Sequence, residues 1–223
     1  MAWRNLPNAI TLGRIVLAAV VAPMLMTDDF VMRLGAFIVF LVAAFSDLVD
    51  GKLARSRNLI TDFGKLMDPL ADKLLLGATF IPFFVLSNWT EPESGFPWFS
   101  GAHPLWARAV LPWWIVAIIF GREVFITVFR GFAAKRGVVL AAGKAGKLKA
   151  VFQNIFIGAA IFWYALQSAA RENAWDSGLW NTWQWFHFVF TVVNLAVAVV
   201  LTVYSLYVYL RDFSTLKQPR AAG

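Results

Sequence analysis

The chain has 223 residues, and 60% of them are hydrophobic, whereas roughly 45–50% are apolar in a soluble globular domain. Charged residues make up 15%, against about 25% in such domains. This composition excludes an ordinary soluble domain and predicts an all-α polytopic membrane protein, forming a single domain over residues 1–223. Because the sequence contains no cysteine, disulfides, thiolate metal sites and thiol nucleophiles are also excluded.

The chain has an excess of basic residues, and their distribution indicates which partners it binds. The formal net charge is +7, but the basic residues lie in short segments between apolar runs. This pattern favours anionic membrane phospholipid and phosphate-bearing substrates, and we expect no nucleic acid partner.

The N-terminal part combines an amphipathic lead-in with a first span. Residues 1–8 are expected to form a short interfacial helix. Residues 10–26 follow as the first transmembrane helix, a length that suits a bilayer core of about 30 Å. Arg14 lies unusually deep in this span. Either its side chain snorkels to the interface, or Asn8, Thr11 and Arg14 share a helical face that points into a site.

The second predicted span starts near residue 31 and continues into a stretch with two aspartates, and two more aspartates lie at the start of the third span, residues 68–86. The first two are three residues apart and the last two four apart, so each pair shares a face if its segment is helical. Pro69 is expected in the first turn of the third helix, where no amide donor is needed. A turn between the pairs would gather the carboxylates, whose repulsion divalent cations relieve; Mg²⁺ suits such a set. An ordinary polar loop between two membrane helices is the alternative. The aspartates are Asp47, Asp50, Asp68 and Asp72.

The stretch that holds these aspartates resembles the signature of the CDP-alcohol phosphotransferase family, D-x2-D-G-x2-A-R-x8-G-x3-D-x3-D. The other fixed positions of that signature are Gly51, Ala54, Arg55 and Gly64, and all are met. The resemblance implies an integral membrane enzyme that moves a phosphatidyl group from a CDP-linked lipid to an alcohol and releases CMP.

Three further spans are expected at about residues 113–132, 149–169 and 185–209, which gives six transmembrane helices. Arg122 and Arg130 interrupt the fourth span and lie nearly two helical turns apart, so they share a face, while Glu123 is offset and free to pair locally. Lys147 and Lys149 lead into the fifth span. Four such cations suit a phosphate group, although a basic segment also anchors helices at the interface.

The basic region, R-E-V-F-I-T-V-F-R followed by G-K-L-K-A-V-F-Q, resembles that of bacterial phosphatidylglycerophosphate synthases. So do the N-terminal N-L-P-N-A-I-T-L-G-R and the M-D-P-L-A-D-K-L-L of the third span. The resemblance implies CDP-diacylglycerol and sn-glycerol 3-phosphate as substrates and a homodimeric assembly. Another phosphorylated acceptor, such as inositol phosphate, stays open.

Roles for individual residues follow from the resemblance and from the chemistry of the side chains. Two divalent cations, Mg²⁺ or else Mn²⁺, would be held by the four aspartates, with Asp72 also the candidate general base. The expected CDP-lipid ligands are Asn8, Thr11, Arg14, Gly51, Ala54, Arg55 and Gly64. The expected ligands of the acceptor phosphate are Arg122, Arg130, Lys147 and Lys149.

Most of the 20 lysines and arginines fall on the side of the six spans that holds the aspartates and both termini. The positive-inside rule therefore predicts that the site and the termini face the cytoplasm of a bacterial inner membrane. Two rival functions differ from this picture. An intramembrane prenyltransferase would have more spans and release diphosphate, and a small transporter would hold its acids near the middle of the bilayer.

Overall fold

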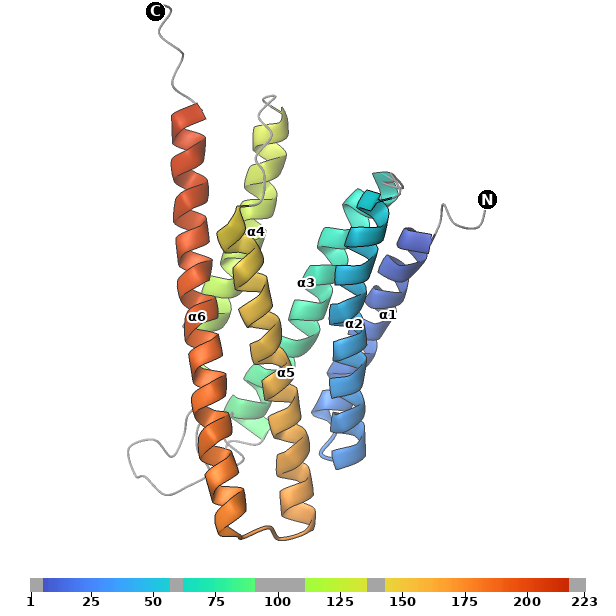
Figure 1. Cartoon of the computed structure of the whole chain (residues 1–223), viewed down its shortest axis with the longest axis vertical. Helices are drawn as coiled ribbons and strands as arrows, with labels where there is room; N and C mark the ends of the chain where they lie inside the picture. Colours follow the sequence, from blue (N-terminus) through green and yellow to red (C-terminus); the bar gives the residue numbers. More distant parts are fainter. Residues whose placement is uncertain (1–5, 57–61, 91–110, 136–142, 217–223) are drawn as a thin grey trace, which may run out of the picture. The chain divides into compact units, whose positions relative to one another are not determined.

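The computed structural model describes residues 6–56, 62–90, 111–135 and 143–216, with side chains described over 8–46, 67–90, 111–133 and 145–211 and at 143 and 213. Every element of these ranges is helical, so the prediction of an all-α protein with six long helices is confirmed (Figure 1). A π-helical turn, η2 (Leu86–Thr90), extends the third helix. The six helices are α1 (Leu6–Met26), α2 (Phe30–Ser56), α3 (Asp62–Val85), α4 (Trp113–Lys135), α5 (Lys144–Glu172) and α6 (Gly178–Leu216).

Four segments of the described chain are long and apolar enough to cross a membrane, which makes this a multi-pass membrane protein: Asn8–Met26, Met67–Thr90, Ala145–Glu172 and Gly178–Arg211. The apolar part of α2, Phe30–Ser46, is shorter. Helix α4 has the length of a span, but Arg122, Glu123 and Arg130 interrupt it. The expected interfacial helix over residues 1–8 lies mostly outside the described residues, and Leu6 to Asn8 belong to α1.

Helix α3 begins earlier than the sequence predicts. It starts at Asp62, six residues before the expected start near residue 68. Pro69 therefore lies in the helix interior and not in the first turn, so that expectation is wrong. Residues 62–66 are of mixed polarity, and the helix continues through them ahead of the apolar span that begins at Met67.

The chain divides into two compact units, residues 1–111 with 157–191 and residues 112–156 with 192–223. Helices α5 and α6 each contribute to both units. The single domain expected from the sequence stays a prediction.

In the first unit, α1 packs against both α2 and α3. Helix α2 also meets the second half of α5, where a side chain at Gly158 would lie 3.5 Å from the Phe40 ring, so a small residue permits the close approach. Phe83 of α3 stacks on Tyr164 of α5 with ring centroids 6.1 Å apart. Small residues and stacked rings thus hold these four helices together.

A buried arginine fastens the start of α2 to α5. Arg33 has no exposed surface. Its guanidinium donates hydrogen bonds to the Ser168 hydroxyl at 2.8 Å and to the carbonyl oxygens of Leu25 and Tyr164, each at 3.3 Å. It also pairs with Asp28 at 3.2 Å. Because a buried charge is tolerated only when it is paired and hydrogen-bonded, these contacts explain how the arginine can lie inside the unit.

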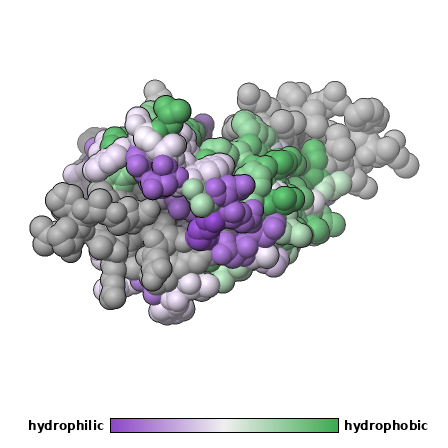
Figure 2. Space-filling view, turned by 90° about the horizontal axis from the view of Figure 1, so that it is seen from below, coloured by the Kyte–Doolittle hydropathy of each residue, from purple (hydrophilic) through white to green (hydrophobic). Residues whose placement is uncertain are grey.

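The helix ends in this region face a polar environment. Asp29 caps α2 by accepting a 2.7 Å hydrogen bond from the Met32 amide, and Ser177 caps α6 by accepting one from the Trp180 amide. Figure 2 looks onto the end that holds the α5–α6 connection and shows hydrophilic residues gathered there beside hydrophobic ones. This end therefore suits a membrane surface.

Candidate active site

The signature is carried by the end of α2 and the start of α3. Asp47, Asp50, Gly51, Ala54 and Arg55 belong to α2, and Gly64, Asp68 and Asp72 belong to α3. Both aspartate pairs are therefore on helices, as their spacing predicts, and each pair shares a helical face. The side chains at positions 47–66 lie outside the described ones, so the structure describes the acid cluster through Asp68 and Asp72.

Helix α1 supplies direct partners for these two aspartates. The Thr11 hydroxyl donates a 2.7 Å hydrogen bond to Asp68 Oδ1. The guanidinium of Arg14 lies 3.5 Å from Asp72 Oδ1 and 3.8 Å from Asp68 Oδ1. Thr11 and Arg14 are buried, whereas the Asp68 and Asp72 side chains are 52% and 59% exposed. Asn8, one helical turn before Thr11, is half-buried.

The burial of Arg14 decides between the two interpretations of its depth in the span. Its side chain is 1% exposed, so it does not snorkel to the surface. An arginine inside a membrane helix is costly unless acids or carbonyl groups compensate it, and here two carboxylates do so. Those carboxylates keep an exposed side, which leaves their outer oxygens accessible.

The described acids of the site have the chemistry of divalent cation ligands. Asp68 and Asp72 offer only carboxylate oxygens, the hard ligands that Mg²⁺ and Mn²⁺ prefer. Among the described side chains no group of three or more acidic or imidazole residues could hold a metal ion. The carboxylates of Asp68 and Asp72 are compatible with a divalent cation, and the side chains of Asp47 and Asp50, the other two expected ligands, lie outside the described ones.

In the second unit, the basic residues of α4 and α5 meet around one acid. Glu123 accepts a 3.0 Å hydrogen bond from Arg122 and also pairs with Lys149, so two of the four predicted phosphate ligands lie together. Arg122 and Lys149 have little exposed surface, and Lys147 is exposed. A side chain at Gly146 would lie 3.5 Å from the Arg122 guanidinium, so this position of α5 approaches Arg122 closely.

Arg130 has a different environment. Its Nε donates a 3.3 Å hydrogen bond to the Tyr209 hydroxyl on α6, and its guanidinium lies 5.7 Å from the centre of that ring. Tyr209 is not among the predicted site residues, because a lone tyrosine in an apolar helix carries no local signal of a distant partner.

Two buried side-chain atoms of the second unit have no hydrogen-bond partner among the described residues. They are Arg122 Nε on α4 and the Gln153 side-chain oxygen on α5. Leaving such a group unpaired costs free energy, so an arginine with a spare buried donor is suited to an anionic ligand.

Comparisons with known proteins agree with the signature. A family model described as CDP-alcohol phosphatidyltransferase matches residues 4–204. A Bacillus subtilis protein named CDP-diacylglycerol–glycerol-3-phosphate 3-phosphatidyltransferase is 36% identical over 167 residues, which is 70% of this chain and 75% of the relative. A Mycobacterium tuberculosis protein named probable phosphatidylglycerophosphate synthase is 33% identical over 157 residues, 69% of this chain and 64% of the relative. An Arabidopsis thaliana protein, CDP-diacylglycerol–glycerol-3-phosphate 3-phosphatidyltransferase 2, is 29% identical over 214 residues, 93% of this chain and 78% of the relative.

Proposed function

Because this chain belongs to the CDP-alcohol phosphatidyltransferase family, we infer that it transfers the phosphatidyl group of CDP-diacylglycerol to sn-glycerol 3-phosphate, giving phosphatidylglycerol phosphate and CMP. The observation that carries this inference is the complete family signature on α2 and α3, within a match over residues 4–204. The names of the bacterial and plant relatives support the acceptor and a role in phospholipid biosynthesis.

The cluster of four aspartates is the proposed catalytic site. Two divalent cations would be held by the four aspartates, Asp47, Asp50, Asp68 and Asp72. Bound there, they would neutralise the negative charge of the diphosphate and of the departing CMP. The four carboxylates outnumber Arg14 and Arg55, the two arginines of the proposed site, so the net charge would favour cation binding. The contacts of Thr11 and Arg14 support a role in orienting Asp68 and Asp72.

Asp72 is the proposed general base. It would accept the proton of the attacking glycerol 3-phosphate hydroxyl as that oxygen forms a bond to the β-phosphorus of CDP-diacylglycerol. The bond from this phosphorus to the oxygen of CMP then breaks, and CMP leaves with its electron pair. Direct in-line transfer needs no covalent enzyme intermediate.

The remaining residues are proposed substrate ligands. Asn8, Thr11, Arg14, Gly51, Ala54, Arg55 and Gly64 would bind the CDP-lipid, with Thr11 and Arg14 acting partly through the aspartates that they contact. Arg122, Arg130, Lys147 and Lys149 would bind the acceptor phosphate. The unpaired buried Nε of Arg122 supports the assignment of these basic residues to the acceptor phosphate. When no phosphate is bound, Glu123 would compensate part of the positive charge of Arg122 and Lys149.

An acceptor panel tests the proposed function. Purified protein is incubated with CDP-diacylglycerol and Mg²⁺, the alcohol is varied, and CMP release is measured with and without excess EDTA. We expect turnover with glycerol 3-phosphate that EDTA abolishes and Mg²⁺ or Mn²⁺ restores. Preference for inositol phosphate would replace the acceptor and keep the family chemistry, whereas full activity in EDTA would contradict the cation site. Light scattering in detergent would test the proposed homodimer.

A further inference from the structure

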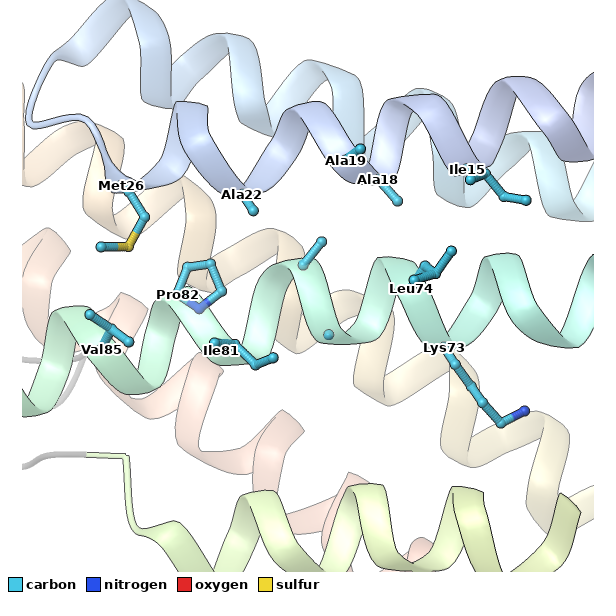
Figure 3. A pocket seen from close by; sticks show the side chains of 12 residues that line it. Ile15, Ala18, Ala19, Ala22, Met26, Lys73, Leu74, Ile81, Pro82 and Val85 are labelled. Carbon is cyan, nitrogen blue, oxygen red and sulfur yellow. The ribbon is translucent and has the colours of Figure 1, made fainter. Parts of the chain in front are cut away.

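An apolar groove of about 570 Å³ runs between α1 and α3 in the first unit (Figure 3). Its size lies within the range of roughly 300–1,000 Å³ that is usual for small-molecule sites. Small side chains on both helices keep the space between them open, and Lys73 is the one charged residue of the lining. The small residues of the lining are Ala18, Ala19 and Ala22 of α1 and Gly77 and Ala78 of α3.

The groove begins beside the acid pair. Ile15 and Lys73, which line one end, directly follow Arg14 and Asp72 in the sequence, and those two residues form an ion pair. From that end, α1 and α3 run in the same direction, and Met26 and Val85 line the other end (Figure 3). One end of the groove is thus lined by direct chain neighbours of Arg14 and Asp72, of which Asp72 is proposed to help hold the diphosphate of the lipid substrate.

The length of the groove matches the depth of one bilayer leaflet. Helix α3 rises roughly 18 Å between Lys73 and Val85 at 1.5 Å per residue. Half of the hydrocarbon core of a bilayer is about 15 Å, which is the depth that one lipid chain spans. A lipid whose phosphates lie at the acid pair would therefore reach the far end of the groove with its chain.

Lys73 separates a polar end of the groove from its apolar length. Its Nζ donates a 3.1 Å hydrogen bond to the Pro69 carbonyl, one turn back toward the start of α3. Lys73 lines the groove, and its ammonium group lies toward the start of α3, as expected of a lysine at a membrane interface. A positive charge at this level complements the phosphates of a lipid headgroup.

We propose that the groove between α1 and α3 holds one acyl chain of CDP-diacylglycerol during the reaction. The proposal rests on the phosphatidyl transfer proposed above. An acyl chain gains little hydrophobic free energy on moving from the bilayer into the groove, because lipid tails are as apolar as the lining. The groove instead orients the lipid, so that its β-phosphorus stays aligned with the attacking hydroxyl.

Chain length gives a direct test, because only a long chain reaches the distal end. The ratio of kcat/KM for dipalmitoyl over dioctanoyl CDP-diacylglycerol is measured by CMP release for the unmodified protein, Ala22→Phe and Val20→Phe. Ala22 lines the distal part of the groove, whereas Val20 is an exposed α1 residue outside the lining. We expect the ratio to fall about tenfold in Ala22→Phe, because the added ring overpacks an occupied groove, and to stay unchanged in Val20→Phe.

The ratio compares the two donors within one variant. A fraction of poorly inserted protein lowers the activity with both donors equally, so it leaves the ratio unchanged. An unchanged ratio in Ala22→Phe, or an equal fall in Val20→Phe, overturns the proposal. Absence of CMP release by the unmodified protein with either donor would instead refute the proposed function.

A labelling experiment on the unmodified protein is independent of variants. CDP-dipalmitoylglycerol with a photoreactive group near the end of one chain should label peptides that contain Met26 or Val85, and unlabelled CDP-diacylglycerol should compete. Equal labelling by phosphatidylethanolamine carrying the same photoreactive chain would show a site for bulk lipid and overturn the proposal. Labelling confined to other helices would overturn it as well.

Discussion

At the scale of single residues, the site is organised by a buried cation between two exposed anions. Arg14 lies within 4 Å of both Asp68 and Asp72, so it fixes the two carboxylates that helical spacing alone places only on a common face. Helix α1 thereby contacts the proposed site although the signature lies on α2 and α3. Lysine would be a poor substitute for Arg14, because a planar guanidinium can face two carboxylates at once whereas an ammonium group is a single point charge.

Thr11→Val tests whether α1 positions the acid pair. The substitution keeps the shape of the side chain and removes the 2.7 Å hydrogen bond to Asp68. Hydrogen bonds to charged groups contribute roughly 1.5–3 kcal/mol, so we expect kcat/KM to fall at least tenfold and the Mg²⁺ requirement to rise. The matched control is Thr27→Val, which removes a 3.0 Å hydrogen bond to the Pro23 carbonyl at the other end of α1. Similar activity losses in both variants would argue against a positioning role.

Asp72→Asn separates the general base from the cation ligands. The amide keeps the shape and one oxygen, but it cannot accept the proton, and loss of a positioned base typically costs about 10²- to 10⁴-fold in rate. We expect kcat to collapse while CDP-diacylglycerol still binds. Asp68→Asn should weaken binding of cation and nucleotide together. A near-normal kcat in Asp72→Asn would assign the proton to another acceptor.

At the scale of elements, α4 and α5 hold two of the four predicted phosphate ligands, Arg122 and Lys149, through one shared acid. Glu123 binds Arg122 and Lys149, so the basic cluster is partly compensated and does not stand as four free charges. An incoming phosphate would therefore compete with Glu123. From the sequence, only a pairing of Glu123 with a neighbour on the same helix could be predicted. Its contact with Lys149 could not, because that contact depends on how α5 packs against α4.

Arg122→Ala should impair use of the acceptor more than use of the lipid. Loss of one charge-assisted hydrogen bond costs roughly 1.5–3 kcal/mol, or about ten- to a hundred-fold in affinity, so the KM for glycerol 3-phosphate should rise by that factor. The KM for CDP-diacylglycerol should change little. Arg171→Ala is the control, because this arginine binds Asp28 at the other end of α5. Unchanged acceptor kinetics in Arg122→Ala would remove Arg122 from the site.

The pH dependence of stability should reveal the contact between the α1–α2 connection and α5. Burial raises the pKa of Asp28, but hydrogen bonds from Arg171 and Ser168 and the charges of Arg171 and Arg33 outweigh it and hold the pKa below its usual value. The stabilisation is therefore present above the ordinary pKa of about 3.9 and is lost as the pH falls through the lowered one. Asp28→Asn should lower the apparent Tm at neutral pH, and the difference should shrink in acid. Asp176→Asn, in the α5–α6 connection, should show no such trend.

The helices show how far the sequence predicts this fold. Apolar runs located all six, because each buries a hydrophobic face or faces lipid over a fixed length. Their ends were less predictable: α6 extends from Gly178 to Leu216, well beyond residues 185–209, because hydropathy marks the bilayer and not the helix termini. In the site, helical spacing predicted that Thr11 and Arg14 share a face. Their partners, and the contact of Arg130 with Tyr209, follow from tertiary packing that one sequence does not encode locally.

At the scale of the whole molecule, the direction of the helices fixes the side on which the signature lies. Asp28, just before α2, contacts Arg171 at the end of α5, so the start of α2 and the end of α5 share one membrane surface. Helix α2, 27 residues long, then runs away from that surface, and its last part carries the first half of the signature. The signature and the α5–α6 connection are therefore expected on opposite sides, and the excess of basic residues predicts that the signature faces the cytoplasm.

Cysteine labelling tests this orientation, because the natural chain contains no cysteine. Helix α5 is about 43 Å long at 1.5 Å per residue, enough to cross a bilayer with its headgroups. Gly143→Cys and Asp176→Cys place single thiols at exposed positions beyond its two ends. A membrane-impermeant maleimide added to intact spheroplasts should label Asp176→Cys at once and Gly143→Cys only after permeabilisation. The reverse pattern would place the signature outside, away from the cytoplasmic CDP-lipid and Mg²⁺, and labelling of both from one side would refute α5 as a span.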